Sequence, residues 1–126
     1  MIQVIGLTLS RLGKANNQMS IQNVEVCEFD IPYRKNIPVI DAFDGCKFIK
    51  VKDEDGKIKM LIFPNWYSHN EMYFQRFGGK GIISAGFISA GDTLVATGRS
   101  TSINGYPSAS NDDTVVLNEY LKTKMA

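Results

Sequence analysis

His69 is the only histidine of the chain, and it follows Ser68 at a point where a helix is expected to begin. An imidazole titrates near neutral pH and can exchange a proton, and the amides at the start of a helix point toward anions. A second polar segment, from Gly98 to Ser102, adds a guanidinium and three hydroxyl groups. The sequence therefore predicts a phosphate-binding site with His69 as its catalytic residue and with these ligand-binding residues: Ser68, Asn70, Gly98, Arg99, Ser100, Thr101 and Ser102.

Each of these residues can also be interpreted as having a purely structural role. His69 would then be a surface or half-buried helix residue, and Arg99 would be the solvent-exposed end of a strand. The hydroxyls of residues 100–102 would bond to their own backbone in a turn. The nearby aromatic residues would mostly pack in the core, with one or two of them stacking against a base or ring. Those aromatic residues are Trp66, Tyr67, Tyr73, Phe74 and Phe77.

Three short segments between Trp66 and Gly105 form a pattern of their own. They are Tyr67–Met72, Ser84–Ile88 and Ala96–Ser100. In type and order they resemble the Janus family, which includes the protein histidine phosphatases. Members of that family carry a Tyr-His-x-Asp-Ile-type helix start, a Gly-Gly-Gly run before a hydrophobic strand, and a Tyr-Gly-x-Ser turn after the next strand. The resemblance implies that His69 matches the catalytic histidine, and that amides beside it and around Ser100 and Ser102 hold phosphate.

The chain departs from the family pattern at two kinds of position. Of the three glycines only Gly86 is present, and Phe87 stands where the family enzymes carry a basic residue. The family also has an N-terminal basic residue, for which the chain offers Arg11, Lys14 and Arg34, all on expected loops. These departures suit capture of a phosphate-bearing ligand better than its hydrolysis.

The expected function is therefore binding of a phosphorylated small molecule or phosphoprotein in a Janus-like pocket. Hydrolysis of the phosphohistidine phosphatase type is left open. One alternative is a non-catalytic, nucleotide-binding or sequestering accessory protein of the phage type. Another is a structural or interaction protein that makes its contacts through Pro32–Pro38 and Gly105–Pro107.

The charge balance and the lack of long apolar runs indicate which kinds of partner to expect. The chain has 126 residues and a net charge of +1, from 14 basic and 13 acidic side chains. This balance lacks the basic surplus typical of duplex nucleic-acid binding. No signal-peptide pattern and no membrane-spanning apolar run is found, so we expect a cytoplasmic protein, in a cell or in an infected host. A pocket in so short a chain is most readily built between subunits, so we expect a homo-oligomer.

No metal or cofactor is expected. Cys27 and Cys46 lack Cys-x-x-Cys spacing, and with a single histidine they fall short of the four sulfur or nitrogen ligands that a structural zinc site usually has. They are expected to be reduced and buried. The acidic cluster Asp53–Asp55 is too short for a cation-binding loop and is interpreted as a solvated turn.

The elements that would position the site follow from hydrophobic patterns. Expected strands are Met1–Leu9, Ile21–Phe29, Lys47–Val51, Ile58–Phe63, Ile82–Ser89 and Thr93–Thr97. Expected loops are Arg11–Gln18 and Asp30–Pro38. A helix is expected near Trp66–Phe77, closed by Gly78, and a second one after the capping residue Ser110. The apolar stripe of the second helix is Val116, Leu117, Tyr120 and Leu121.

These elements predict the α+β class. Short turns, such as the one at Asp55-Gly56, join consecutive strands and so favour antiparallel pairing. We expect a single domain over residues 1–126, with a mostly antiparallel sheet of about six strands and two helices. The last helix is C-terminal and packs on the sheet.

Overall fold

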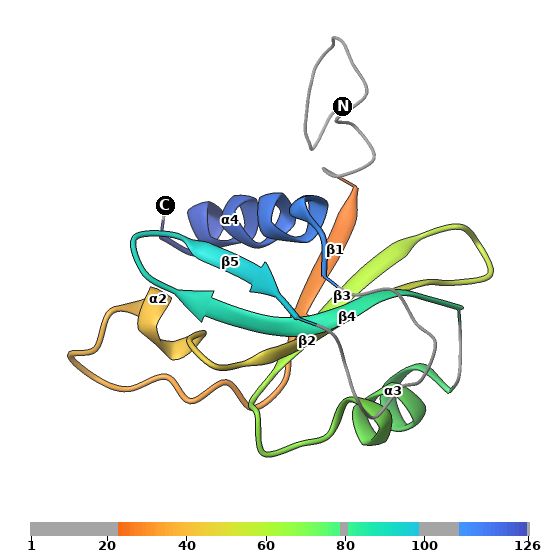
Figure 1. The fold of residues 1–126 in the computed structure, drawn as a ribbon, viewed down its shortest axis with the longest axis horizontal. Coiled ribbons are helices and arrows are strands. Elements are labelled where there is room, and N and C mark those ends of the chain that lie inside the picture. Colours follow the sequence, from red (N-terminus) through yellow and green to blue (C-terminus); the bar gives the residue numbers. More distant parts are fainter. Residues whose placement is uncertain (1–22, 79–80, 99–108, 126) are drawn as a thin grey trace, which may run out of the picture.

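The fold is a five-stranded sheet with one longer helix on each face, seen in a computed structural model that describes residues 23–78, 81–98 and 109–125 (Figure 1). The elements are β1 (Val24–Glu28), α2 (Val39–Ala42), β2 (Lys47–Lys52), β3 (Ile58–Phe63), α3 (His69–Phe77), β4 (Gly81–Ala90), β5 (Leu94–Thr97) and α4 (Asn111–Met125). The expected α+β class and the C-terminal helix on the sheet are confirmed. The described residues form five strands rather than six, and the expected strand Met1–Leu9 and loop Arg11–Gln18 lie outside them.

The strand order is β1-β3-β2-β4-β5, and all neighbours are antiparallel except β1 and β3. The two expected hairpins, β2–β3 and β4–β5, are present. The segment between β1 and β2 is irregular apart from the single turn of α2, because Pro32 and Pro38 supply no amide hydrogen. This long connection carries the chain past β3, so β1 becomes a parallel edge strand.

The β2–β3 turn explains the acidic cluster. The Asp53 carboxylate accepts hydrogen bonds from the backbone amides of Asp55 and Lys57, each at 2.9 Å. Gly56 adopts a φ of 82°, a left-handed conformation that a side chain would disfavour. The cluster therefore stabilises a turn.

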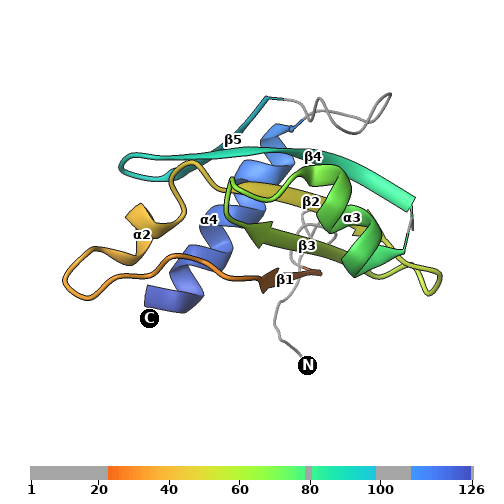
Figure 2. The same ribbon diagram turned by 90° about the horizontal axis from the view of Figure 1, so that it is seen from below.

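The two faces of the sheet carry separate cores because side chains alternate along each strand. On one face Phe48, Met60, Ile62 and Ile88 pack with Val116, Leu117 and Leu121 of α4. On the other face Ile49, Leu61 and Phe63 pack with Met72 and Tyr73 of α3. Seen from below in Figure 2, α3 lies in front of the sheet and α4 crosses behind it. None of the helices in the described ranges has the apolar length needed to cross a bilayer.

Helix α4 is joined to the sheet by a buried ion pair. Lys50 Nζ on central strand β2 lies 2.6 Å from Asp113 Oδ1, and the side chains are 9% and 0% exposed. The other carboxylate oxygen accepts the Ser110 amide at 3.0 Å, as expected for a cap at the helix start. Asp113 therefore serves both the helix start and the sheet.

Helix α3 is shorter than the expected Trp66–Phe77. It begins at His69, because the Ser68 hydroxyl accepts the Glu71 amide at 3.0 Å as an N-cap, and it ends at Gly78 in a left-handed conformation. Two of the aromatic residues expected in the core are on the surface, since Trp66 is 61% exposed and Phe74 is 58% exposed. Trp66 precedes the helix, so helical spacing does not govern where its ring lies.

Candidate functional site

His69 is buried at the start of α3, where its ring faces the sheet. Its exposed fraction is 2%. The imidazole makes edge-on contacts with Phe63 and Phe87, at ring-centroid distances of 5.8 and 5.2 Å. Both phenylalanines stand on the α3 side of the sheet, on β3 and β4. The site histidine is therefore enclosed by aromatic walls.

One ring nitrogen of His69 is held by the backbone of β4. Nε2 lies 2.8 Å from the carbonyl oxygen of Gly86. A carbonyl only accepts hydrogen bonds, so Nε2 carries the hydrogen, and in a neutral ring Nδ1 is then the unprotonated nitrogen. Burial lowers the pKa of His69, the bond to Gly86 opposes this in part, and the charge of Lys47 lowers the pKa further. The imidazole is therefore neutral at pH 7.

Gly86 is required by close packing on the opposite side of β4. A Cβ atom at this position would lie 2.6 Å from the carbonyl oxygen of Thr97 and 3.0 Å from Cβ of Ala109. No side chain fits without movement of backbone atoms. Gly86 thus allows β4 to approach its neighbours while its carbonyl orients His69.

Lys47 is the site residue that the sequence did not reveal. It is half-buried, its Nζ donates a hydrogen bond to the carbonyl oxygen of Tyr67 at 2.9 Å, and it lies 5.9 Å from the centre of the Phe87 ring. Burial lowers the pKa of the ammonium. Lys47 opens an ordinary strand in the sequence, and only its register opposite Phe87 brings it to the site.

No carboxylate neutralises this lysine. All 13 acidic side chains lie within the described parts of the chain, and none of them forms an ion pair with Lys47. The start of α3, whose dipole is positive at that end, follows Tyr67, the residue whose carbonyl accepts the hydrogen bond from Lys47. Lys47 is therefore a half-buried cation without a paired carboxylate.

Gly98 marks the point at which the hydroxyl-rich segment leaves the described structure. Its φ is 75°, and a Cβ there would lie 3.1 Å from the Phe87 ring. Ala109, on the far side of the segment, donates its amide to the Gly98 carbonyl at 3.0 Å. The two ends of segment 99–108 therefore meet beside the phenylalanine that also contacts His69. Arg99, Ser100, Thr101 and Ser102 lie outside the described residues, and their approach to His69 stays a prediction.

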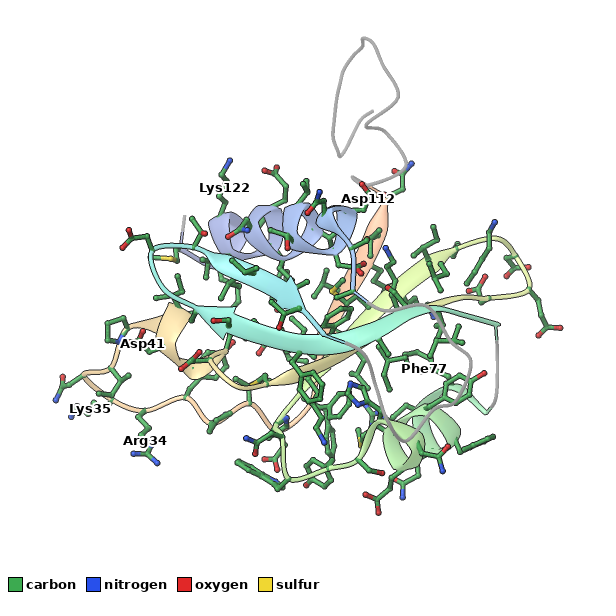
Figure 3. All side chains as sticks on the ribbon, viewed as in Figure 1. Arg34, Lys35, Asp41, Phe77, Asp112 and Lys122 are labelled. Atoms are coloured by element: carbon green, nitrogen blue, oxygen red, sulfur yellow. The ribbon has the colours of Figure 1, made fainter. Side chains whose placement is uncertain are left out.

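The other predicted residues divide by role. The Ser68 hydroxyl is used as the helix cap, and Asn70 is exposed on the first turn of α3. Arg34 lies on the connection between β1 and α2 and points outward, well separated from Phe77 of α3 (Figure 3). Lys47, by contrast, contacts Tyr67 and lies near Phe87, whose ring also contacts His69. Arg11 and Lys14 lie outside the described residues.

The thiols and acidic groups offer no second centre in the described part of the chain. There, no three His, Cys, Asp or Glu side chains group as metal ligands would. Cys27 and Cys46 are free, and burial raises the pKa of Cys46 to about 11. A thiol with a raised pKa is a poor nucleophile at neutral pH.

The fold and the site together define an α+β protein with a buried, neutral imidazole and an unpaired, half-buried lysine at the start of one helix. Comparison of the chain with protein-family models, with curated proteins and with solved structures found no match. The function is therefore argued from the geometry.

Proposed function

We propose that the protein binds a phosphate-bearing ligand at the start of α3, with Lys47 as the main cation and His69 as a positioning residue. The observation that carries this proposal is the half-buried ammonium of Lys47, which none of the 13 acidic side chains pairs with. Partly burying a charge without a counter-charge costs free energy, and a bound anion would recover it.

The surroundings of Lys47 suit a phosphoryl group. Its ammonium has three hydrogens, of which the Tyr67 carbonyl takes one, so donors are left for a ligand. The positive end of the α3 dipole favours an anion at the same place. Arg99 and the hydroxyls of Ser100, Thr101 and Ser102, which follow Gly98 in the sequence, are proposed to complete the binding groups.

Hydrolysis of the phosphohistidine phosphatase type is the second candidate. It is favoured by the ring geometry of His69, in which Nε2 is tied to Gly86 and Nδ1 is left as the basic nitrogen. Access of a substrate to a ring that is 2% exposed would require movement of its neighbours. For this reason we place binding first.

Calorimetric titration with inorganic phosphate tests the binding proposal. We expect binding by the wild type and an affinity about 10-fold lower or worse for Lys47→Met, because a charge-assisted hydrogen bond is lost. Lys52→Met is the matched control, since Lys52 is exposed at the other end of β2. Equal affinities for the wild type and Lys47→Met would refute the proposal. Turnover of a phosphohistidine peptide by the wild type and by His69→Gln tests hydrolysis separately.

A further inference from the structure

We infer that the ligand is a nucleotide, whose phosphate lies at Lys47 and whose base stacks on the indole ring of Trp66. This inference rests on the proposed function, because it assigns the rest of the ligand once its phosphate is held at Lys47. It goes further in naming a second contact surface, made by an aromatic side chain that packing in the protein does not explain.

Trp66 is exposed yet held in place. Its exposed fraction is 61%. The indole packs against the Tyr67 ring, with the ring centroids 6.3 Å apart and the ring planes tilted by 45°. The Tyr67 ring is itself held by its hydroxyl, which donates to the Asp30 carboxylate at 3.1 Å. A neighbouring ring therefore supports a large aromatic surface that remains open to water.

The indole of Trp66 and the ammonium of Lys47 are both next to Tyr67. Lys47 Nζ contacts the carbonyl oxygen of Tyr67 at 2.9 Å, and Tyr67 directly follows Trp66. Consecutive Cα atoms are about 3.8 Å apart, so the two groups are separated by a short stretch of backbone.

The chemistry of the pair selects the ligand class. Inorganic phosphate or a sugar phosphate would engage Lys47 and leave the indole unused. A base offers a π-face to the ring, and base–aromatic stacking tolerates different bases. A ligand with both a phosphate and a flat aromatic ring uses both surfaces, and a nucleotide has both groups.

The inference is tested by comparing a complete nucleotide with two ligands, one of which lacks the base and the other the phosphate. Calorimetry gives the affinities of adenosine monophosphate, ribose phosphate and adenosine for the full chain. Trp66 is the only tryptophan, so quenching of intrinsic fluorescence reports stacking directly. We expect adenosine monophosphate to bind about 10-fold more tightly than ribose phosphate and to quench the fluorescence.

Two variants separate stacking from general effects. Trp66→Leu is expected to bind adenosine monophosphate and ribose phosphate equally. Phe74→Leu is the matched control, because Phe74 is 58% exposed on α3, the helix that follows Trp66, and its replacement should leave the difference unchanged. Circular dichroism establishes that both variants fold.

The outcomes distinguish the two claims. Equal affinities of the wild type for adenosine monophosphate and ribose phosphate would overturn the nucleotide inference and leave the phosphate site standing. Binding of adenosine as tight as that of the monophosphate, unaffected by Lys47→Met, would overturn the phosphate site. Binding of none of the three ligands would overturn both.

Discussion

Lys47 on β2 and Phe87 on β4 lie directly opposite each other, with the ammonium 5.9 Å from the centre of the ring. Phe87 occupies the position at which the Janus pattern would place a basic residue. Lys47 therefore places a positive charge beside this aromatic ring from the adjacent strand.

Lys47 is expected to contribute to anion binding without stabilising the folded state. Burial lowers the pKa of its ammonium, which means that the folded state disfavours the charge. We predict that Lys47→Met melts at the same temperature as the wild type or higher when no anion is present. Added inorganic phosphate should raise the melting temperature of the wild type alone. A variant that melts several degrees lower would show that the lysine is structural.

His69 is expected to make stability depend on pH. Its pKa in the folded state lies below its value in the unfolded chain, so the folded state resists protonation. Stability should be full above about pH 6.5 and fall as the pH drops through the folded pKa. Denaturant unfolding at several pH values measures this slope, which His69→Gln should reduce. His69→Ala should cost about 2–4 kcal/mol, because it leaves a cavity and an unpaired Gly86 carbonyl. An unchanged slope in His69→Gln would contradict the assignment.

Glu28 is expected to join the two ends of the described chain. It accepts hydrogen bonds from the hydroxyls of Tyr33, at 2.6 Å, and Tyr120, and pairs with Lys124 at 3.0 Å. Burial alone would raise the pKa of Glu28, but these partners together lower it. The stabilisation is therefore present above about pH 4.3 and lost as the pH falls below it.

Replacing this carboxylate tests the cluster. Glu28→Gln should destabilise the protein by about 1–3 kcal/mol at neutral pH, measured by urea unfolding. Glu119→Gln is the matched control, since its pair with Lys122 is solvent-exposed and should be worth little. Equal effects of the two substitutions would contradict a special role for Glu28.

Removing one partner of the Lys50–Asp113 pair is expected to lower the free energy of unfolding strongly, whereas replacing both partners by apolar residues is expected to lower it much less. Asp113→Ala leaves a buried ammonium and should cost about 3–5 kcal/mol. The double variant Lys50→Met, Asp113→Leu removes both charges and should recover much of that loss. Chemical denaturation of the single and double variants supplies the comparison. A double variant as unstable as Asp113→Ala would show that the pair contributes net stability.

Local signals predicted much of this fold. Three predicted features depend only on residues that are close together in the sequence, and all three are present. They are the Asp55-Gly56 turn, the cap at Ser110 and the apolar stripe of α4. The parallel pairing of β1 with β3 was not predicted, because it depends on the irregular route of the chain between β1 and β2. Pairing between distant strands leaves no local pattern.

The same limit applies to the candidate site. His69 was identified from its residue type and its place at a helix start, but its burial follows from Phe63 and Phe87 on two other strands. Lys47 was missed because its role depends on strand register alone. The exposure of Trp66 was missed because the Ser68 cap starts the helix after it.

The most direct test of the central claim is an NMR titration of the uniformly labelled chain with inorganic phosphate. We predict the largest shift changes at the Lys47 side chain and at the backbone amides of Tyr67, Ser68 and His69, with smaller changes elsewhere. Saturable shifts confined to another surface, or no saturable shift at these residues, would contradict a phosphate site at the start of α3.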